Sequence, residues 1–319
     1  MLIPRFFVGM VPVGMMVLGA APVFGQNYPN KHIRILTGPT GGTLDFGARV
    51  LAQGISGPLG QQVIVDNRGI SGIENAAKAP PDGYTLVYYT SPFWLAPFLR
   101  LNPTWDPVKD FAPISLTDRA PNFLVVHPSL PVKSVKELIA LANARPGALN
   151  YAGASIGSSA HLSAELFKAM AGVNIVSIPY KGGGPSLNAL IAGEVQLMFS
   201  PSGSSVPHVK SGRLRALAVS GAEPSATFPE LPTVAASGLP GYESEAFVGV
   251  FAPAGTPAAI INRLHQEIVQ CLGRADVKEK FLNLGVETVG SSPEQFAVKM
   301  KSEMVKWEKV IKDAGIRAE

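Results

Sequence analysis

Short apolar runs alternate with stretches of helical periodicity along most of the chain. Residues 33–36 are mostly β-branched or apolar, and they precede residues 37–43, which are too rich in Gly and Pro for a helix or a strand. From residue 44 to 55 the apolar positions return at helical spacing, and Thr43 is placed to cap that helix. The pattern predicts a buried strand, a glycine loop and a helix in direct succession.

The same order of strand, loop and helix recurs further along the chain. Strands are predicted at 62–66, 84–90, 149–154, 173–178, 194–199, 214–219 and 246–251, and helices at 72–78, 162–170 and 187–191. Repeated βα units predict parallel sheets in an α/β protein, with ligands bound at the carboxyl ends of the strands.

Some segments do not follow this simple repeat. Residues 111–116 and 123–126 each have the composition of a strand, and the turn-forming residues 118–121 lie between them, so we predict two strand pieces joined by a turn. A loop is predicted at 200–203. The aromatic-rich segment 91–101 either packs in the core or lines an apolar cleft wall.

Capping signals mark the remaining helices. Ser134 followed by Glu137 predicts a capping box. Thr256 and Pro257 predict a capped start for a helix that carries Cys271 in the core, and the final helix is predicted to start with a cap at residues 292–295. We interpret the apolar stripe of that final helix as core packing: Phe296, Met300, Met304, Trp307 and Ile311.

Residues 1–25 have the composition of a secretory signal peptide. Arg5 is their only charge, an apolar run extends from Phe6 to Val23, and the run ends in small residues. We therefore expect cleavage ahead of Gln26 and export of the mature chain. A membrane anchor is the alternative reading, but the run is barely long enough to span a bilayer and a polar Gln-Asn pair follows it.

Composition narrows the classes of function. Removing 25 of the 319 residues would leave 294, enough for one large domain or two of ordinary size. Cys271 is the only cysteine, which excludes an intrachain disulfide, and no cluster of Cys, His and carboxylates has the spacing of a metal site. The formal charge of +4 falls to +3 without Arg5, and the basic residues are scattered. We expect a monomer without metal, cofactor or nucleic acid.

The glycine loop at 37–43 has the properties of an anion site. Glycine lets the backbone approach a ligand closely, and a helix start offers unpaired N–H groups and a partial positive charge. Residues 155–159 form a second small polar loop before a helix start. The alternative is that the glycines only serve turn geometry. Neither a Walker loop nor a dinucleotide fingerprint is present, because the Gly-Lys-Ser/Thr sequence and the required glycine spacing are missing.

Short motifs in a fixed order extend along the whole chain after the signal. They are Tyr28-Pro29, Ile33-Arg34, 41–45, Ala48-Arg49, 65–68, 81–86, Asp106-Pro107, 109–115, Gly157 with 160–162, 179–182, 214–218 and 251–257. Each is weak alone, but together in this order they are specific. On these residues the chain resembles the extracytoplasmic solute-binding proteins of the tripartite tricarboxylate transporter group, often called the Bug family.

The resemblance implies the type 2 fold of periplasmic binding proteins, in which two α/β lobes close on a ligand in the cleft between them. It implies a first lobe made of 26–122 and 248–319 and a second lobe made of 123–247. Two strands would cross between the lobes near Asn122 and Phe247. It also implies capture of a small organic acid and delivery to the membrane permease of a tripartite tricarboxylate transporter.

In this family the ligand's carboxylate is held mainly by backbone N–H groups and small hydroxyls, partly through ordered water. The resemblance therefore implies that residues 37–45 and 155–161 face each other across the cleft. Neither loop contains an Arg, so we expect no salt bridge to the ligand and interpret Lys181 as a loop-bracing or rim residue. The implied ligand-binding residues are Gly38, Thr40, Gly41, Gly42, Thr43, Asp45, Ser155, Gly157, Ser158, Ser159, His161, Tyr180, Lys181 and Ser200.

Two departures from the family pattern fall where ligand selectivity should be decided. In the first loop, where family members usually carry Phe or another bulky residue together with Pro, this chain has Thr37-Gly38-Pro39-Thr40. After the strand that ends at Phe199, many members carry Asp-Asn, and this chain has Ser200-Pro201. The sequence therefore names neither citrate, an amino acid nor an aromatic acid as the ligand.

Two other functions stay open at this stage. A receptor that signals to a membrane sensor would have the same sequence features. A secreted serine hydrolase would need nucleophiles and bases, for which the candidates are Ser158, Ser159, Ser205, His127, His161 and His208. No Gly-x-Ser-x-Gly elbow is present, and His161 falls at a helix start, where capping or packing is commoner, so we expect no enzyme.

Overall fold

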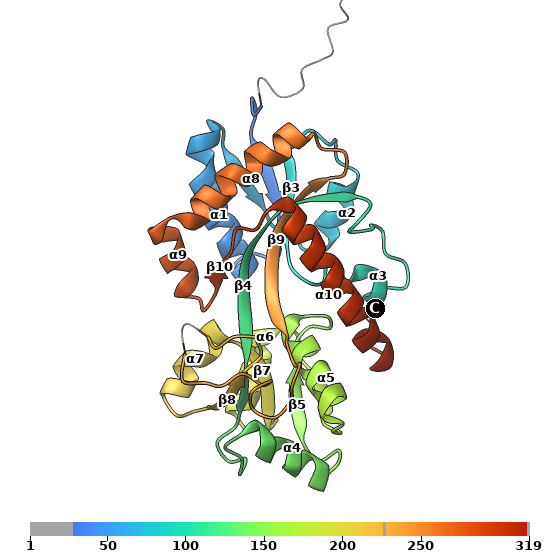
Figure 1. Ribbon diagram of the computed structural model, residues 1–319, viewed down its shortest axis with the longest axis vertical. Helices are drawn as coiled ribbons and strands as arrows, with labels where there is room; N and C mark the ends of the chain where they lie inside the picture. Colours follow the sequence, from blue (N-terminus) through green and yellow to red (C-terminus); the bar gives the residue numbers. More distant parts are fainter. Residues whose placement is uncertain (1–27, 226–227, 318–319) are drawn as a thin grey trace, which may run out of the picture.

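The computed structural model describes residues 28–225 and 228–317, which form two α/β lobes stacked along the longest axis of the molecule (Figure 1). The predicted signal peptide, residues 1–25, lies outside the described residues. The upper body in Figure 1, called the first lobe below, contains β1 (Ile33–Leu36), β2 (Val63–Asp66) and β3 (Thr85–Tyr89). The lower body, the second lobe, contains β5 (Asn150–Gly153), β6 (Val176–Pro179), β7 (Leu197–Pro201) and β8 (Arg215–Val219).

Two long strands connect the lobes. β4 (Phe111–Val126) and β9 (Glu245–Pro253) pair antiparallel and run from one lobe into the other (Figure 1). They join all strands into one sheet with the order β2-β1-β3-β9-β4-β7-β5-β6, and β8 and β10 (Glu287–Thr288) also pair with β4. The predicted parallel βα units are present in both lobes, because β1 pairs in parallel with β2 and β3, and β5 with β6 and β7.

The predicted turn at 118–121 is wrong, because β4 runs through these residues without a break. Asp118 lies opposite Val248, and Pro121 lies opposite Glu245. The register of β4 against β9 shifts on both sides of Leu116, and these irregularities let β4 stay paired with β9 along this stretch. Long-range pairing therefore overrides a local composition that is typical of turns.

Helices cover both faces of the sheet. The first-lobe helices are α1 (Thr43–Leu59), α2 (Ser71–Ala77), α3 (Ala96–Leu99), α8 (Ala258–Gly273), α9 (Ala275–Leu282) and α10 (Pro293–Asp313). The second-lobe helices are α4 (Val135–Ala144), α5 (Ser159–Ala171), α6 (Gly183–Ile191) and α7 (Ser202–Lys210). The predicted loop at 200–203 is wrong, because β7 continues to Pro201 and α7 starts at Ser202. The sequence of α7 has no apolar stripe, and the buried residues of this helix are serines, so hydrophobic periodicity does not reveal it.

The observed caps agree only in part with the predictions. Ser292 forms the complete capping box of α10, and the hydroxyl of Ser134 accepts a hydrogen bond from the N–H of Glu137. The Glu137 carboxylate accepts from Lys133 N rather than from the cap residue, so that capping box is incomplete. Two cap predictions are wrong, because Gly42 and Pro257 occupy the positions assigned to Thr43 and Thr256.

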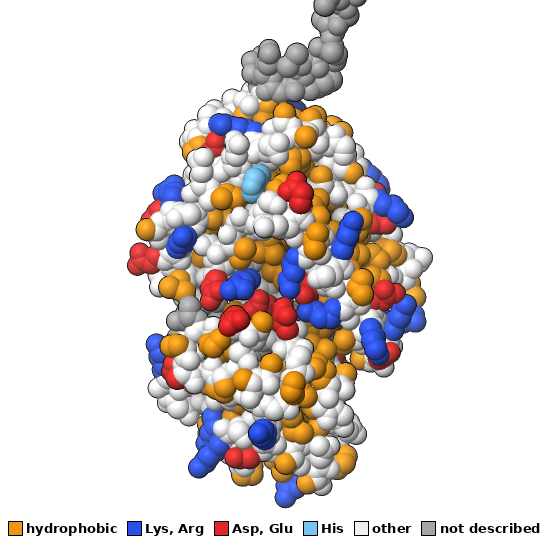
Figure 2. Space-filling model, in the orientation of Figure 1, with side chains coloured by type: hydrophobic (Ala, Val, Ile, Leu, Met, Phe, Trp, Pro, Cys, Tyr) orange, Lys and Arg blue, Asp and Glu red, His pale blue; other side chains and the backbone are white. Residues whose placement is uncertain are grey.

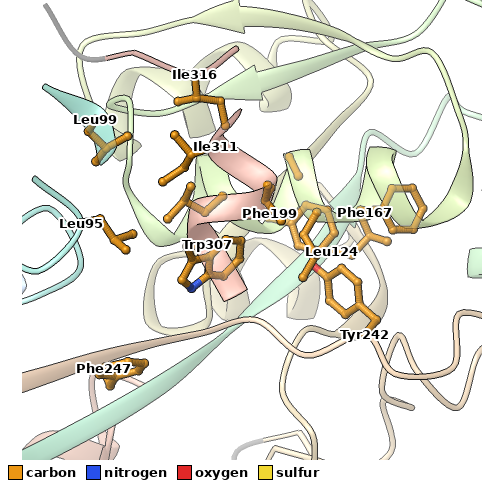
Figure 3. Close-up of a cluster of buried hydrophobic side chains, with 14 of the residues drawn as sticks. Leu95, Leu99, Leu124, Phe167, Phe199, Tyr242, Phe247, Trp307, Ile311 and Ile316 are labelled. Carbon is orange, nitrogen blue, oxygen red and sulfur yellow. The ribbon is translucent and has the colours of Figure 1, made fainter. Parts of the chain in front are cut away.

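The core confirms several interpretations of the apolar pattern. Cys271 is buried, and the stripe of α10 packs inward, with Met304 half-buried. Trp94 of the aromatic segment is buried and stacks on Phe247 of β9, with 4.8 Å between ring centroids. One cluster of buried side chains includes Leu124, Phe199 and Tyr242 together with Trp307 and Ile311 of α10, and so extends across both lobes (Figure 3).

A substitution in β9 tests how closely α10 packs on the crossing strands. A Cβ on Gly249 would lie 2.0 Å from Cζ of Phe296. We expect Gly249→Ala to reduce the free energy of unfolding by about 1–3 kcal/mol, because the buried ring must move out of a well-packed position. Urea unfolding followed by circular dichroism measures the change. Gly273→Ala, whose added Cβ meets no atom within 4 Å, is the control; an equal loss in both variants would contradict the packing argument.

Candidate ligand site between the lobes

The direction of the strands brings the candidate loops together. β3 and the first-lobe half of β4 are both antiparallel to β9, so β1, β2 and β3 run toward the second lobe. β7 is antiparallel to β4, so β5, β6 and β7 run toward the first lobe. The carboxyl ends of both sets of parallel strands therefore face each other, and the starts of α1, α5, α6 and α7 lie at this boundary.

The first loop exposes backbone at the start of α1. Gly38 is buried, whereas residues 39–43, Thr40 included, are exposed. Gly42 is the N-cap residue of α1, and no side chain caps the N–H groups of this helix start. No described hydrogen bond uses the N–H of Gly42 or Thr43. These donors are available to an anion, and the positive end of the helix dipole lies behind them.

Asp45 braces this loop from below. One oxygen of its buried carboxylate accepts a hydrogen bond from the N–H of Gly41 at 2.9 Å. The other oxygen contacts Arg49 Nε at 2.8 Å and Asn67 Nδ2 at 2.9 Å. Asn67 also donates to the carbonyl of Gly38 at 2.8 Å. The hydrogen bond from Arg49 is the largest cause that lowers the pKa of Asp45 to about 2, and the hydrogen bond from the Gly41 N–H is the next. The carboxylate is therefore charged, and both of its oxygens are engaged in hydrogen bonds.

The second loop is held in place by hydrogen bonds to His161. Ser158 is the N-cap residue of α5, and its hydroxyl accepts a hydrogen bond from His161 N. The N–H of Gly157 donates to His161 Nδ1 at 3.4 Å, which leaves the ring proton on Nε2. Burial lowers the pKa of His161, so the imidazole is neutral near pH 7. Ser155 is exposed and Ser159 is half-buried at the same helix start.

This second loop also touches the first lobe. The hydroxyl of Ser91 donates to the carbonyl of Gly157 at 3.2 Å. A Cβ on Gly157, which has a φ of +76°, would lie 2.6 Å from Cδ1 of Leu99. Gly157 is therefore required by both its backbone angle and its packing. No described hydrogen bond joins residues 37–45 to residues 155–161.

The third loop follows β6. Burial is the main cause that raises the pKa of Tyr180, and the carboxylate of Glu194 raises it further. Lys181 is exposed and takes part in no ion pair among the described residues. Residues 182–184 open α6, and a Cβ added at any of the three glycines would meet no atom within 4 Å. No side chain caps the N–H groups of this helix start, which is thus a further open backbone surface.

Ser200 lies at the end of β7, fully buried, with its hydroxyl 3.3 Å from that of Ser204. The adjacent start of α7 at Ser202 belongs to the same boundary between the lobes and was missed by the sequence prediction. Its serine-rich sequence has no hydrophobic signal, although a Ser-Pro-Ser-Gly run is a weak indication of a helix start.

The hydrolase alternative gains no support from these contacts. No described hydrogen bond joins Ser158, Ser159 or Ser205 to a ring nitrogen of the candidate histidines. The hydroxyl of Ser205 donates to the carbonyl of Pro201 at 3.1 Å. Nδ1 of His127 lies 2.7 Å from the hydroxyl of its near neighbour Ser129, a local contact in an exposed turn.

Charged side chains gather on the face of the molecule that carries the crossing strands (Figure 2). Arg119 of β4 pairs with Glu287 of β10 at 3.1 Å, and Lys299 of α10 pairs with Glu243 at 3.3 Å and with Glu303 at 3.0 Å. These pairs tie β10 and α10 to the connection between the lobes. Arg119 and Lys299 are both engaged in these pairs.

Across 28–225 and 228–317, no group of three or more His, Cys, Asp or Glu side chains could hold a metal ion. Over the same ranges, no helix combines the length and the apolar character that a membrane span requires.

The fold and the facing loops define a two-lobed solute-binding protein of the periplasmic type. Residues 47–316 match the family described as the tripartite tricarboxylate transporter family receptor. The chain belongs to this family.

Relatives of known sequence and structure agree with that assignment. Protein BugT of Bordetella pertussis is 37% identical over 305 residues, which cover 93% of this chain and 94% of the relative. The structure of Rpa4515 from R. palustris with adipate has 38% identity and a TM-score of 0.80, covering 91% of this chain and 99% of that one. MatC from Rhodopseudomonas palustris with bound malate has 29% identity and a TM-score of 0.77, with coverage of 89% and 100%.

The role of Asp45 as a brace predicts a pH dependence. Its folded-state pKa of about 2 lies below the ordinary value of 3.8, so its contribution to stability is present above pH 4 and is lost as the pH falls toward 2. We expect Asp45→Asn to lower the melting temperature at pH 7, and the difference from the unsubstituted protein to shrink between pH 4 and pH 2. Thermal unfolding at five pH values measures this.

The control for this experiment is Asp82→Asn, which removes an aspartate that is 41% exposed and paired with Lys31. Little change is expected there, because exposed ion pairs contribute little to stability. A difference for Asp45→Asn that stays constant down to pH 2 would contradict the assigned role.

Proposed function

We propose that the chain is a periplasmic receptor that captures a small organic acid between its lobes and delivers it to the permease of a tripartite tricarboxylate transporter. The observation that carries the proposal is the convergence of open helix starts at the facing carboxyl ends of the two sets of strands. Membership of a receptor family supports delivery to a transporter rather than catalysis. Two related structures are described with adipate and with malate, both dicarboxylic acids.

We also propose how the chain is divided and processed. Residues 26–122 and 248–319 form one lobe and residues 123–247 the other, with the pivots near Asn122 and Phe247. The positions of β4 and β9 support these boundaries. The mature chain begins near Gln26, is exported to the periplasm and acts as a monomer.

The recognition chemistry we propose depends on backbone dipoles rather than on a cationic side chain. Arg49 is held by Asp45 below the first loop, and Lys181 is exposed at the rim. The carboxylate is then bound by N–H groups at the starts of α1 and α5 and by small hydroxyls such as Ser159. Hydrogen bonds to a charged group contribute roughly 1.5–3 kcal/mol each, so two or three of them suffice for specific binding.

Substitution of Gly42 tests the proposed anion site. Its φ of −87° suits any residue, and an added Cβ has only an ordinary contact with Pro39 O at 3.6 Å, so Gly42→Val should fold. The valine side chain would occupy the space in front of the free N–H groups. We expect the affinity for adipate or malate, whichever binds, to fall by about 100-fold or more, which corresponds to losing about two charge-assisted hydrogen bonds. Titration calorimetry measures the affinity.

Lys181→Met is the comparison variant, and it should lower affinity less than about fivefold, because exposed charges interact weakly. Circular dichroism confirms that both variants are folded. Gly157 is unsuited to this test, since a side chain there would strain the backbone and collide with Leu99. If Lys181→Met abolished binding while Gly42→Val retained it, recognition by a side-chain ion pair would replace the proposed mechanism.

A further inference from the structure

The lobes meet in a second place, on the side of the molecule where α9 lies above α7 (Figure 1). The hydroxyl of Ser202, at the start of α7, donates to the carbonyl of Gly285 at 2.8 Å. A Cβ on Gly203 would lie 2.0 Å from the carbonyl oxygen of Leu284. A Cβ on Gly285, which has a φ of +69°, would lie 2.7 Å from the N–H nitrogen of Gly203. The backbones of the two lobes are therefore in direct contact.

This contact lies beside the strands about which the lobes turn. Ser202 directly follows β7, whose last residue is opposite Asn122 of β4. Gly285 precedes β10, which pairs with β4 at Asp118 and Arg119. Asn122 and Arg119 are three residues apart, or about 10 Å along a strand. A displacement of the contact acts near the pivot on a short lever, so a shift of ~1 Å there moves the distant ends of the lobes by several times as much.

We propose that residues 202–203 and 284–285 form an interlobe stop, which fixes how far the lobes close and thereby sets the spacing of the ligand loops. The four residues are positioning residues, because they act through the loops at 37–43 and 155–159. Glycine at 203 and 285 lets the two backbones touch, and the Ser202 hydrogen bond holds them in register. Two measurements test the stop. The binding measurement, called the ligand arm, rests on the proposed function; the measurement of the distance between the lobes, called the distance arm, does not.

Gly203→Ala changes the fit of the stop while favouring the local fold. Gly203 is the second residue of α7, and alanine is a better helix former than glycine, so the second lobe should remain folded. The added methyl group must push Leu284 away, and the lobes open. Ser202→Ala is the milder variant, since it removes the hydrogen bond without adding volume. The control is Gly273→Ala, also in a helix, where an added Cβ meets nothing within 4 Å.

The distance arm uses pulsed electron spin resonance on the full mature chain, with spin labels at Lys78→Cys in the first lobe and Lys133→Cys in the second. Cys271 is buried at 3% exposure and stays unlabelled. Without ligand, Gly203→Ala should shift the distance distribution toward longer values, and Gly273→Ala should match the parent protein. Ser202→Ala should shift it in the same direction by a smaller amount, because the hydrogen bond between the lobes is lost.

The ligand arm measures binding of adipate and malate to the same variants. Gly203→Ala should weaken binding about tenfold or more, mainly through faster dissociation, because the loops no longer reach their closed spacing. Unchanged distances in Gly203→Ala would overturn the proposal. If that variant fails to fold, unchanged distances in Ser202→Ala overturn it instead. If the parent protein binds neither acid, the proposed function loses its support, while the ligand-free distances still decide the stop.

Discussion

The antiparallel pairing of β4 with β9 is the constraint on which the rest of the structure depends. From Phe111 to Pro121, β4 is hydrogen-bonded to β9, so the two crossings behave as one ribbon rather than as two flexible linkers. The ribbon sets the direction of every other strand, and this direction turns the carboxyl ends of both parallel sets toward each other. A ligand site between the lobes follows from strand polarity, before any particular side chain is considered.

The loops at that boundary are positioned by side chains that hydrogen-bond to the loop backbone. Asp45 uses both carboxylate oxygens on the loop and on Arg49, and His161 accepts from the backbone of Gly157. What remains open is backbone N–H at helix starts. Such a site attracts an anion without burying an unpaired charge in the empty protein, which would be costly. In the proposed mechanism, release of the ligand would break no buried ion pair.

Much of the architecture could be predicted from the sequence, because hydrophobic periodicity reports directly on burial. The strand at 33–36, the core position of Cys271 and the stripe of α10 all follow from that pattern. The continuity of β4 could not be predicted, since it depends on a partner strand more than a hundred residues away. The start of α7 was missed because its buried residues are serines. At the site, local sequence located the loops, but the bonds that occupy Asp45 depend on Asn67 in another βα unit.

A crystal structure of the protein with its bound acid tests the central claim most directly. We expect a carboxylate between the lobes, with its oxygens about 3 Å from N–H nitrogens at the starts of α1 and α5. We also expect Asp45 to hold Arg49 below the first loop in that complex. A carboxylate paired with Lys181 or with an arginine side chain, or an acid bound outside the boundary between the lobes, would contradict the account.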